Sequence, residues 1–135
     1  MAKVVLKDAF VSINSVDLSD HVASVTLTST DDVVETTGMG ANSKTRVAGL
    51  TDNSISIEFH QDFVTSSVEA TIFPLLGTVT TVLVRPTSAV VGATNPSYTM
   101  SALVSEWTPI DGTVGALATS KVTWPISGAI TKAVA

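Results

Sequence analysis

Three ionisable side chains alternate along one short stretch of the sequence. Glu58, His60 and Asp62 occupy alternate positions, so a continuing strand would place a carboxylate, an imidazole and a second carboxylate on one face. Such groups could ligate a divalent metal or serve a small hydrolase. However, the row would span roughly 13 Å at about 3.3 Å per residue, which is too long for one ion. We therefore interpret the trio as the polar face of a strand, with Phe63 starting the following turn.

The other candidates for chemistry are weaker. Asp31, Asp32 and Glu35 form an acidic run, but it lacks the acidic ladder, central glycine and closing glutamate of a calcium-binding loop. His21 stands alone after Asp20, and the sequence contains no nucleophile-elbow, zinc-protease or phosphate-loop motif. The absence of cysteine excludes disulfide scaffolds, zinc fingers, iron–sulfur sites and thiol catalysis. We predict no catalytic constellation, no metal site and no cofactor, and therefore no enzyme.

The composition describes a single domain, residues 1–135, with an unusually uncharged surface. Of the 135 residues, 44% are hydrophobic and 14% are charged, where soluble domains average about 25% charged residues. The mean hydropathy is +0.42, but no apolar run reaches the roughly 18 residues of a transmembrane helix. The apolar run near the first residue is too short to form the core of a secretory signal. The net charge of -5 argues against a protein that binds nucleic acid or anionic lipid through its net charge. We expect a cytosolic product without membrane insertion whose uncharged surface contacts other subunits. The alternative is a hydrophobic monomer kept soluble by its Ser and Thr hydroxyls.

The patterning predicts a mainly β fold. Alternation is clearest in residues 54–60, where Ile55, Ile57 and Phe59 share one face. Further strands are expected over residues 9–14, 21–30, 78–85, 98–107 and 119–126, separated by turn-forming residues. Six or seven strands indicate an antiparallel β-sandwich or partial barrel, and Trp124 alternates with Val122 and Ile126 as a core residue would.

One segment has a helical pattern. Ser66 and Glu69 have the spacing of a capping box, ahead of an apolar face that contains Val68 and Ile72. Pro74 and Gly77 stop the helix, which predicts one short α-helix over about residues 67–76, packed on a face of the sandwich.

The connection over residues 31–51 is long for a compact domain and is rich in Thr, Gly, Asn and Ser. It also carries apolar residues that a permanently solvated loop would not need. We predict an arm without regular structure that orders against a neighbouring subunit, and the alternative is a floppy surface insertion. The residues expected to make this contact are Val33, Val34, Glu35, Met39, Lys44, Arg46, Val47 and Leu50.

Three stretches, in this order and spacing, carry a resemblance to a known family. They are residues 18–27 with the sequence LSDHVASVTL; residues 56–63 (SIEFHQDF) followed by 70–77 (ATIFPLLG); and RPTS at 85–88, NPSY at 95–98, PIDG at 109–112 and VTWP at 122–125. Together they resemble the tail tube (major tail) proteins of long, non-contractile-tailed bacteriophages. The likeness extends from about residue 7 to residue 130.

The resemblance implies a β-sandwich flanked by one helix, assembled as hexameric rings that stack into a hollow tube through which the genome passes. It further implies that residues 31–51 reach a neighbouring subunit or ring, and that terminal arms, residues 1–8 and 128–135, order on assembly. A heterologous contact of this kind propagates until it is capped. Relative to the family, this chain is short and shows no immunoglobulin-like surface domain after the tube domain.

Other implied partners are a tape-measure protein, tail-tip proteins and a tail-terminator protein, with double-stranded DNA passing through the lumen without specific binding. The implied location is the virion, after assembly in the host cytoplasm. A lumen should be acidic or hydroxyl-lined, because each basic phosphate contact would add friction. The lumen-facing candidates are Thr26, Thr28, Ser56, Glu58 and His60, with Asp31, Asp32 and Asp62 near the rim.

Two other readings stay open at this point. The chain could be a different ring-forming virion protein, such as a tail terminator or a head–tail joining protein. It could also be an immunoglobulin-like or carbohydrate-binding module, for which Trp107, Trp124 and Tyr98 are the available stacking residues.

Overall fold

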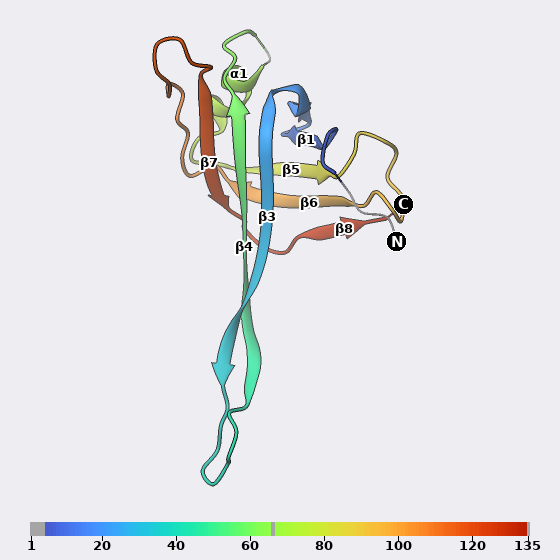
Figure 1. Cartoon of the computed structure of the whole chain (residues 1–135), viewed down its shortest axis with the longest axis vertical. Coiled ribbons are helices and arrows are strands. Elements are labelled where there is room, and N and C mark those ends of the chain that lie inside the picture. The colour runs from blue at the N-terminus through green and yellow to red at the C-terminus, as the bar shows by residue number, and fades with distance from the viewer. Residues whose placement is uncertain (1–4, 66, 135) are drawn as a thin grey trace.

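The computed structural model describes residues 5–65 and 67–134, and it has two antiparallel sheets (Figure 1). The larger sheet has the strand order β2-β1-β5-β6-β8 and the smaller one has the order β3-β4-β7. The strands are β1 (Phe10–Ile13), β2 (Val16–Asp17), β3 (Val22–Glu35), β4 (Arg46–His60), β5 (Val79–Arg85), β6 (Ser97–Leu103), β7 (Thr119–Pro125) and β8 (Thr131–Ala133). In Figure 1 the strands of one sheet run across those of the other, so the fold is the expected mainly β sandwich.

The core lies between the two sheets and follows the predicted alternation. Ile55, Ile57 and Phe59 of β4 are buried, whereas the residues between them are only partly covered. Trp124 of β7 is buried as predicted, and its ring centroid lies 6.5 Å from that of Phe59. Trp107 contacts Phe59 from another side, edge to face, at a centroid distance of 5.8 Å.

A short helical segment covers one end of the sandwich. α1 (Val68–Ile72) continues into the 3-10 turn η2 (Phe73–Leu75), which agrees with the predicted helix. The expected N-cap, Ser66, lies outside the described residues. Glu69, the other member of the expected capping box, accepts a hydrogen bond of 2.6 Å from Trp107 Nε1. Gly77 then turns the chain with a φ of 84°, which favours glycine.

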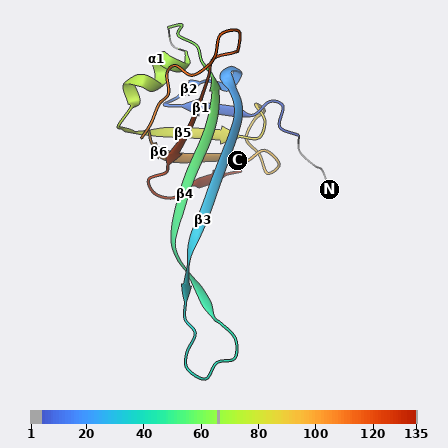
Figure 2. The ribbon, with the colours of Figure 1, turned by 60° about the vertical axis from the view of Figure 1, so that its left-hand side comes forward.

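Residues 31–51 correct the prediction of an irregular connection. β3 continues to Glu35 and β4 begins at Arg46, so only residues 36–45 connect the strands. The two strands form one long hairpin that projects from the body in both views (Figures 1 and 2). We call residues 31–51 the arm. A bulge interrupts the pairing of the two strands: Asp32 alone lies between the pairs Asp31↔Thr51 and Val33↔Ala48, opposite two residues of β4.

Part of the expected C-terminal arm is already paired with the body of the fold. Residues 131–133, expected within a C-terminal arm, form β8 and pair with β6. At the other end, Asp8 makes an isolated bridge with Thr87, and residues 1–4 of the expected N-terminal arm lie outside the described residues. A further 3-10 turn, η1 (Ser19–His21), leads from β2 into β3.

Strand β6 ends earlier than expected, at Leu103 rather than residue 107. The chain leaves the sheet here because the residues that follow pack against the core and hydrogen bond to it. Trp107 packs on Phe59, and the Glu106 carbonyl accepts a hydrogen bond of 2.9 Å from Trp124 Nε1.

Candidate assembly surfaces

The sheet β3-β4-β7 turns one face to the core and leaves the other free. On the free face, the register places Thr26 opposite Ser56 and Ser56 opposite Thr123. Five of the residues predicted to face a lumen therefore share one surface. That surface, which we call the free face, is formed by Ser24, Thr26 and Thr28 of β3, Ser54, Ser56, Glu58 and His60 of β4, and Thr119, Lys121 and Thr123 of β7.

Hydroxyl groups and balanced charges dominate the chemistry of the free face. The Ser56 and Thr123 hydroxyls lie 2.6 Å apart and hydrogen bond across the strands. Glu58 lies directly opposite Lys121, so this carboxylate is matched by one ammonium group. Lys121 was not among the predicted residues, although its place in an alternating stretch would have identified it. Asp52, which pairs with Thr30 and is exposed, continues the same face toward the arm. The free face is therefore hydroxyl-lined and carries no excess of positive charge.

The predicted row of Glu58, His60 and Asp62 does not form. β4 ends at His60, and Asp62 turns away to interact with a different part of the chain. Asp62 Oδ2 lies 2.9 Å from His21 Nε2 and accepts a hydrogen bond of 2.8 Å from the Ser67 hydroxyl. Within residues 5–65 and 67–134, no group of three His, Asp or Glu side chains is arranged to hold a metal ion.

The contacts of Asp62 lower the pKa of its carboxyl below the ordinary value. The largest cause is the hydrogen bond from the Val64 backbone N–H, and the Ser67 hydroxyl adds to it. Partial desolvation opposes the shift, and His21 favours the ionised form. This cluster ties η1 to the loop that precedes α1, so its evident role is to hold that loop in place.

The other two predicted rim residues, Asp31 and Asp32, lie in the arm. Asp31 accepts a hydrogen bond of 2.6 Å from the Thr51 hydroxyl across the hairpin. Both residues are exposed. They lie in the part of β3 that enters the arm, whereas Asp62 follows the last residue of β4, His60.

Both edges of the three-stranded sheet are unpaired in the described part of the chain. β3 forms one edge over its 14 residues, and β7 forms the other. The preceding loop partly covers the β7 edge. Glu106 Oε1 accepts a hydrogen bond of 2.9 Å from the Thr123 backbone N–H, and the Asp111 carbonyl accepts one of 3.2 Å from the Thr119 N–H. A long, exposed edge strand is a template for pairing with another chain.

The arm exposes apolar side chains that its own chain does not cover. Leu50 and Val33 are 82% and 69% exposed, and Met39 is fully exposed near the tip. The charged residues expected in this contact surround them: Lys44 Nζ lies 3.7 Å from Glu35 Oε1, and Glu35 lies opposite Arg46. A two-stranded hairpin is at best marginally stable in water, so the arm has the properties of a segment that is stabilised by a partner.

A second apolar surface lies at the opposite end of the molecule and was not predicted. It is formed by the loops around residues 61–65 and 108–118, which both views place far from the arm (Figures 1 and 2). Gln61 joins these loops through Nε2, which donates a hydrogen bond of 2.6 Å to the Pro109 carbonyl. The exposed residues of this surface, which we call the distal end, are Phe63, Val64, Ile110, Val114 and Leu117. The sequence did carry one signal for this surface, namely apolar residues within two segments that are otherwise rich in turn-forming residues.

The aromatic residues do not form a stacking surface. Trp124 is fully buried, and both Trp107 and Tyr98 are partly buried against the core. A carbohydrate-binding module would present several aromatic faces to solvent. The arrangement therefore disfavours that alternative.

Comparison with solved structures finds the same fold in components of tail-like particles. A chain from a virion of a native gene transfer agent particle matches with a TM-score of 0.73 at 11% identity, over 94% of this chain and 96% of that one. A chain from an extracellular contractile injection system, the PVC sheath–tube complex in its extended state, matches with a TM-score of 0.71 at 12% identity, over 98% and 93%. A chain from the tail of an empty gene transfer agent particle, solved with C6 symmetry, matches with a TM-score of 0.57 at 15% identity, over 82% and 81%.

At these identities the likeness concerns the fold, and it includes a contractile system as well as gene transfer agent particles. It therefore does not single out the non-contractile tails that the sequence resembles. No protein-family model matches the sequence. No curated protein matches it either. In the described residues, every helix is too short or too polar to cross a membrane.

Proposed function

We propose that this chain is a tail tube protein, a structural and non-enzymatic subunit that assembles into stacked hexameric rings around a hollow bore. The observation that carries the proposal is the sheet β3-β4-β7, which is buried on one face, hydroxyl-lined on the other and joined to no further strand at either edge among the described residues. Copies of such a sheet can join edge to edge, with β3 of one copy beside β7 of the next. Because these two edges differ, the contact is heterologous, and each copy can have an identical neighbour on each side. The fold shared with components of tail-like particles supports this reading.

The number of strands that a bore for DNA requires is consistent with assembly from several copies. A barrel that admits a DNA duplex needs more strands than the roughly 16 to 18 that leave an aqueous channel in a porin. Six copies of a three-stranded sheet contribute about eighteen strands, which reaches this range but does not exceed it. The arms of an adjacent ring would add strands to this wall.

The free face is the proposed wall of the bore. Thr26, Thr28 and Ser56 would present hydroxyl groups to passing DNA, and Glu58 and His60 would complete the surface. Glu58 would be balanced by Lys121, so the wall would offer little net positive charge to phosphates. Double-stranded DNA would then pass without specific binding. Asp31, Asp32 and Asp62 would lie toward the two rims of the ring.

The proposed setting is the virion of a phage or phage-like particle, with assembly in the host cytoplasm. In the more specific form that the sequence resemblance supports, the tail is long and non-contractile. Its further partners would be a tape-measure protein, tail-tip proteins and a tail terminator.

Negative-stain electron microscopy of the purified chain over a concentration series tests this proposal. We expect hollow tubes of uniform width above a threshold concentration. Single closed rings at every concentration would instead indicate a terminator or a head–tail joining protein. Dispersed monomers throughout the series would contradict self-assembly and favour a binding module.

A further inference from the structure

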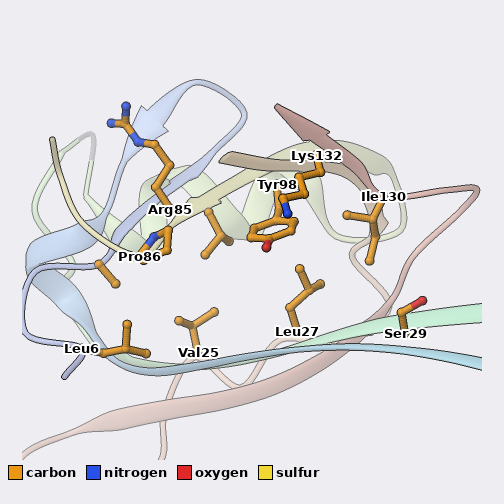
Figure 3. A pocket seen from close by; sticks show the side chains of 11 residues that line it. Leu6, Val25, Leu27, Ser29, Arg85, Pro86, Tyr98, Ile130 and Lys132 are labelled. Atoms are coloured by element: carbon orange, nitrogen blue, oxygen red, sulfur yellow. The ribbon is translucent and has the colours of Figure 1, made fainter. Parts of the chain in front are cut away.

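An open groove of about 500 Å³ lies between β3 and the ends of β5, β6 and β8 (Figure 3). Val25 and Leu27 of β3 point into it from one side, and Tyr98 and Ile130 line it from the other. Leu6 is 59% exposed at its mouth. The groove is thus an apolar surface that the described residues of the chain leave uncovered.

The charged group that the groove presents is a cation. Lys132 lines it and pairs with Tyr98, so the two side chains share one face of the larger sheet. Arg85 also contributes to the lining, but its guanidinium lies over the Phe10 ring at 4.1 Å and points away from the groove (Figure 3). No carboxylate is among the lining residues. A complementary occupant is apolar and carries a carboxylate.

The arm carries such a surface. Val34 lies directly opposite Val47, so the two side chains share one face of the hairpin. Asp32 is on the same face, because a Cβ built on Gly49 would lie 3.1 Å from Asp32 Cβ and 3.2 Å from Val34 Cγ2. All three residues, Asp32, Val34 and Val47, are exposed. We call them the arm patch.

The arm cannot fill the groove of its own copy, so an arm that fills it must belong to another copy. The arm projects away from its own body in both views, whereas the groove lies within the body (Figures 1 and 2). A contact between two different surfaces of identical chains is heterologous, and it propagates along an assembly.

We propose that the groove of one copy receives the arm patch of a second copy. Val34 and Val47 would cover the apolar lining formed by Val25, Leu27, Tyr98 and Ile130, and the Asp32 carboxylate would pair with Lys132 at the rim. This inference rests on the proposed self-assembly and names the surface that receives the arm. The competing receptor is the distal end, which is also apolar.

Cysteine cross-linking distinguishes the two receptors, because the chain contains no cysteine of its own. Purified Val47→Cys copies are mixed with Ile130→Cys copies under assembly conditions, oxidised, and analysed for covalent dimers on a non-reducing gel. The matched control replaces Ile130→Cys with Val114→Cys at the distal end. We expect dimers in the first mixture at a yield several-fold above the second.

A charge exchange gives a second readout. Asp32→Lys alone and Lys132→Asp alone should each reduce cross-linking between positions 47 and 130, and the two changes combined in every copy should restore it. Restoration would not follow if the single changes had merely damaged the fold.

Electron microscopy of the same mixtures separates failure of this inference from failure of the proposed function. Tubes whose Val47→Cys copies cross-link to Val114→Cys, or to neither partner, would overturn the groove as the receptor and leave the tube intact. If the unsubstituted chain forms no assemblies, the proposed function fails and the inference fails with it.

Discussion

Alternate residues of β4 serve two different purposes, since one set builds the core and the other builds the free face. Ile57 is buried, whereas Glu58 beside it is only partly covered. Replacing Ile57 with Ala should destabilise the fold by about 2–5 kcal/mol, because it removes buried methyl groups and leaves a cavity. Glu58→Ala, the matched control, should change stability by no more than about 0.5 kcal/mol. Urea unfolding of both variants measures the difference, and equal effects would contradict the assignment of faces.

The Asp62 cluster gives a stability contribution that depends on pH. Because the folded state lowers the pKa of this carboxyl, the contribution is fully present above its ordinary value of about 3.9 and is lost as pH falls through the lower folded value. Asp62→Asn should therefore lower the Tm at neutral pH, and the difference from the unsubstituted chain should shrink below about pH 4. Thermal unfolding across pH measures this effect.

The control for this experiment is Asp20→Asn, an exposed position next to His21. It should show no such convergence. A Tm difference between Asp62→Asn and the unsubstituted chain that stays constant as the pH falls below about 4 would contradict the role assigned to the ionised carboxylate.

Single residues were predictable where a local period determined them. Burial of Ile55, Ile57 and Phe59 follows from alternation within one strand, which the sequence displays directly. The environment of Asp62 was not predictable, because its partner His21 lies 41 positions away and is brought near only by the tertiary fold.

Among the elements, the arm depends most on one glycine. A Cβ at Gly49 would be crowded against the Cβ of Asp32, which the backbone holds in place, so Gly49→Ala should distort the bulge. We expect a higher threshold concentration for assembly and an unchanged Tm, since the arm lies outside the core. Gly38→Ala is the matched control, because a Cβ at this position in the arm meets nothing within 4 Å. Light scattering over a concentration series compares the two variants, and equal thresholds would contradict a role for the bulge in assembly.

Elements differed in how well the sequence predicted them, for physical reasons. The short helix was predictable because Pro74 and Gly77 end it and Val68 and Ile72 give it a buried face. The hairpin in the arm was missed because neither of its faces is buried in the chain, so no hydrophobic alternation marks it. The three residues of β8 are too few to show a period.

In the proposed tube, the free face lines the bore and the larger sheet faces the exterior. Thr26 and Ser56 lie opposite each other on the free face, so Thr26→Lys with Ser56→Lys should add two cations per copy to the bore. Thr81→Lys with Ser101→Lys is the matched control, since these residues form a facing, exposed pair on the larger sheet.

Tubes of both variants should bind short DNA duplexes in a salt-dependent manner, whereas tubes of the unsubstituted chain should not. Only the first variant should protect the bound DNA from a nuclease. Protection by the second variant alone would contradict the assignment of the bore.

The assembly surfaces were only partly visible in the sequence. Apolar residues in a long connection indicated the arm, but the distal end is built from two loops that the fold brings together through Gln61. Surfaces that bind a partner show no periodic pattern in the sequence. Their residues are determined by the shape of the partner and not by packing against the chain's own core.

The sharpest test of the proposed tube is a cryo-electron microscopy reconstruction of the assembled particles. We expect a hollow tube of stacked six-membered rings whose inner wall is the free face of β3-β4-β7. A reconstruction with Ser56 and Glu58 on the outer surface, or with a single closed ring that does not stack, would contradict it.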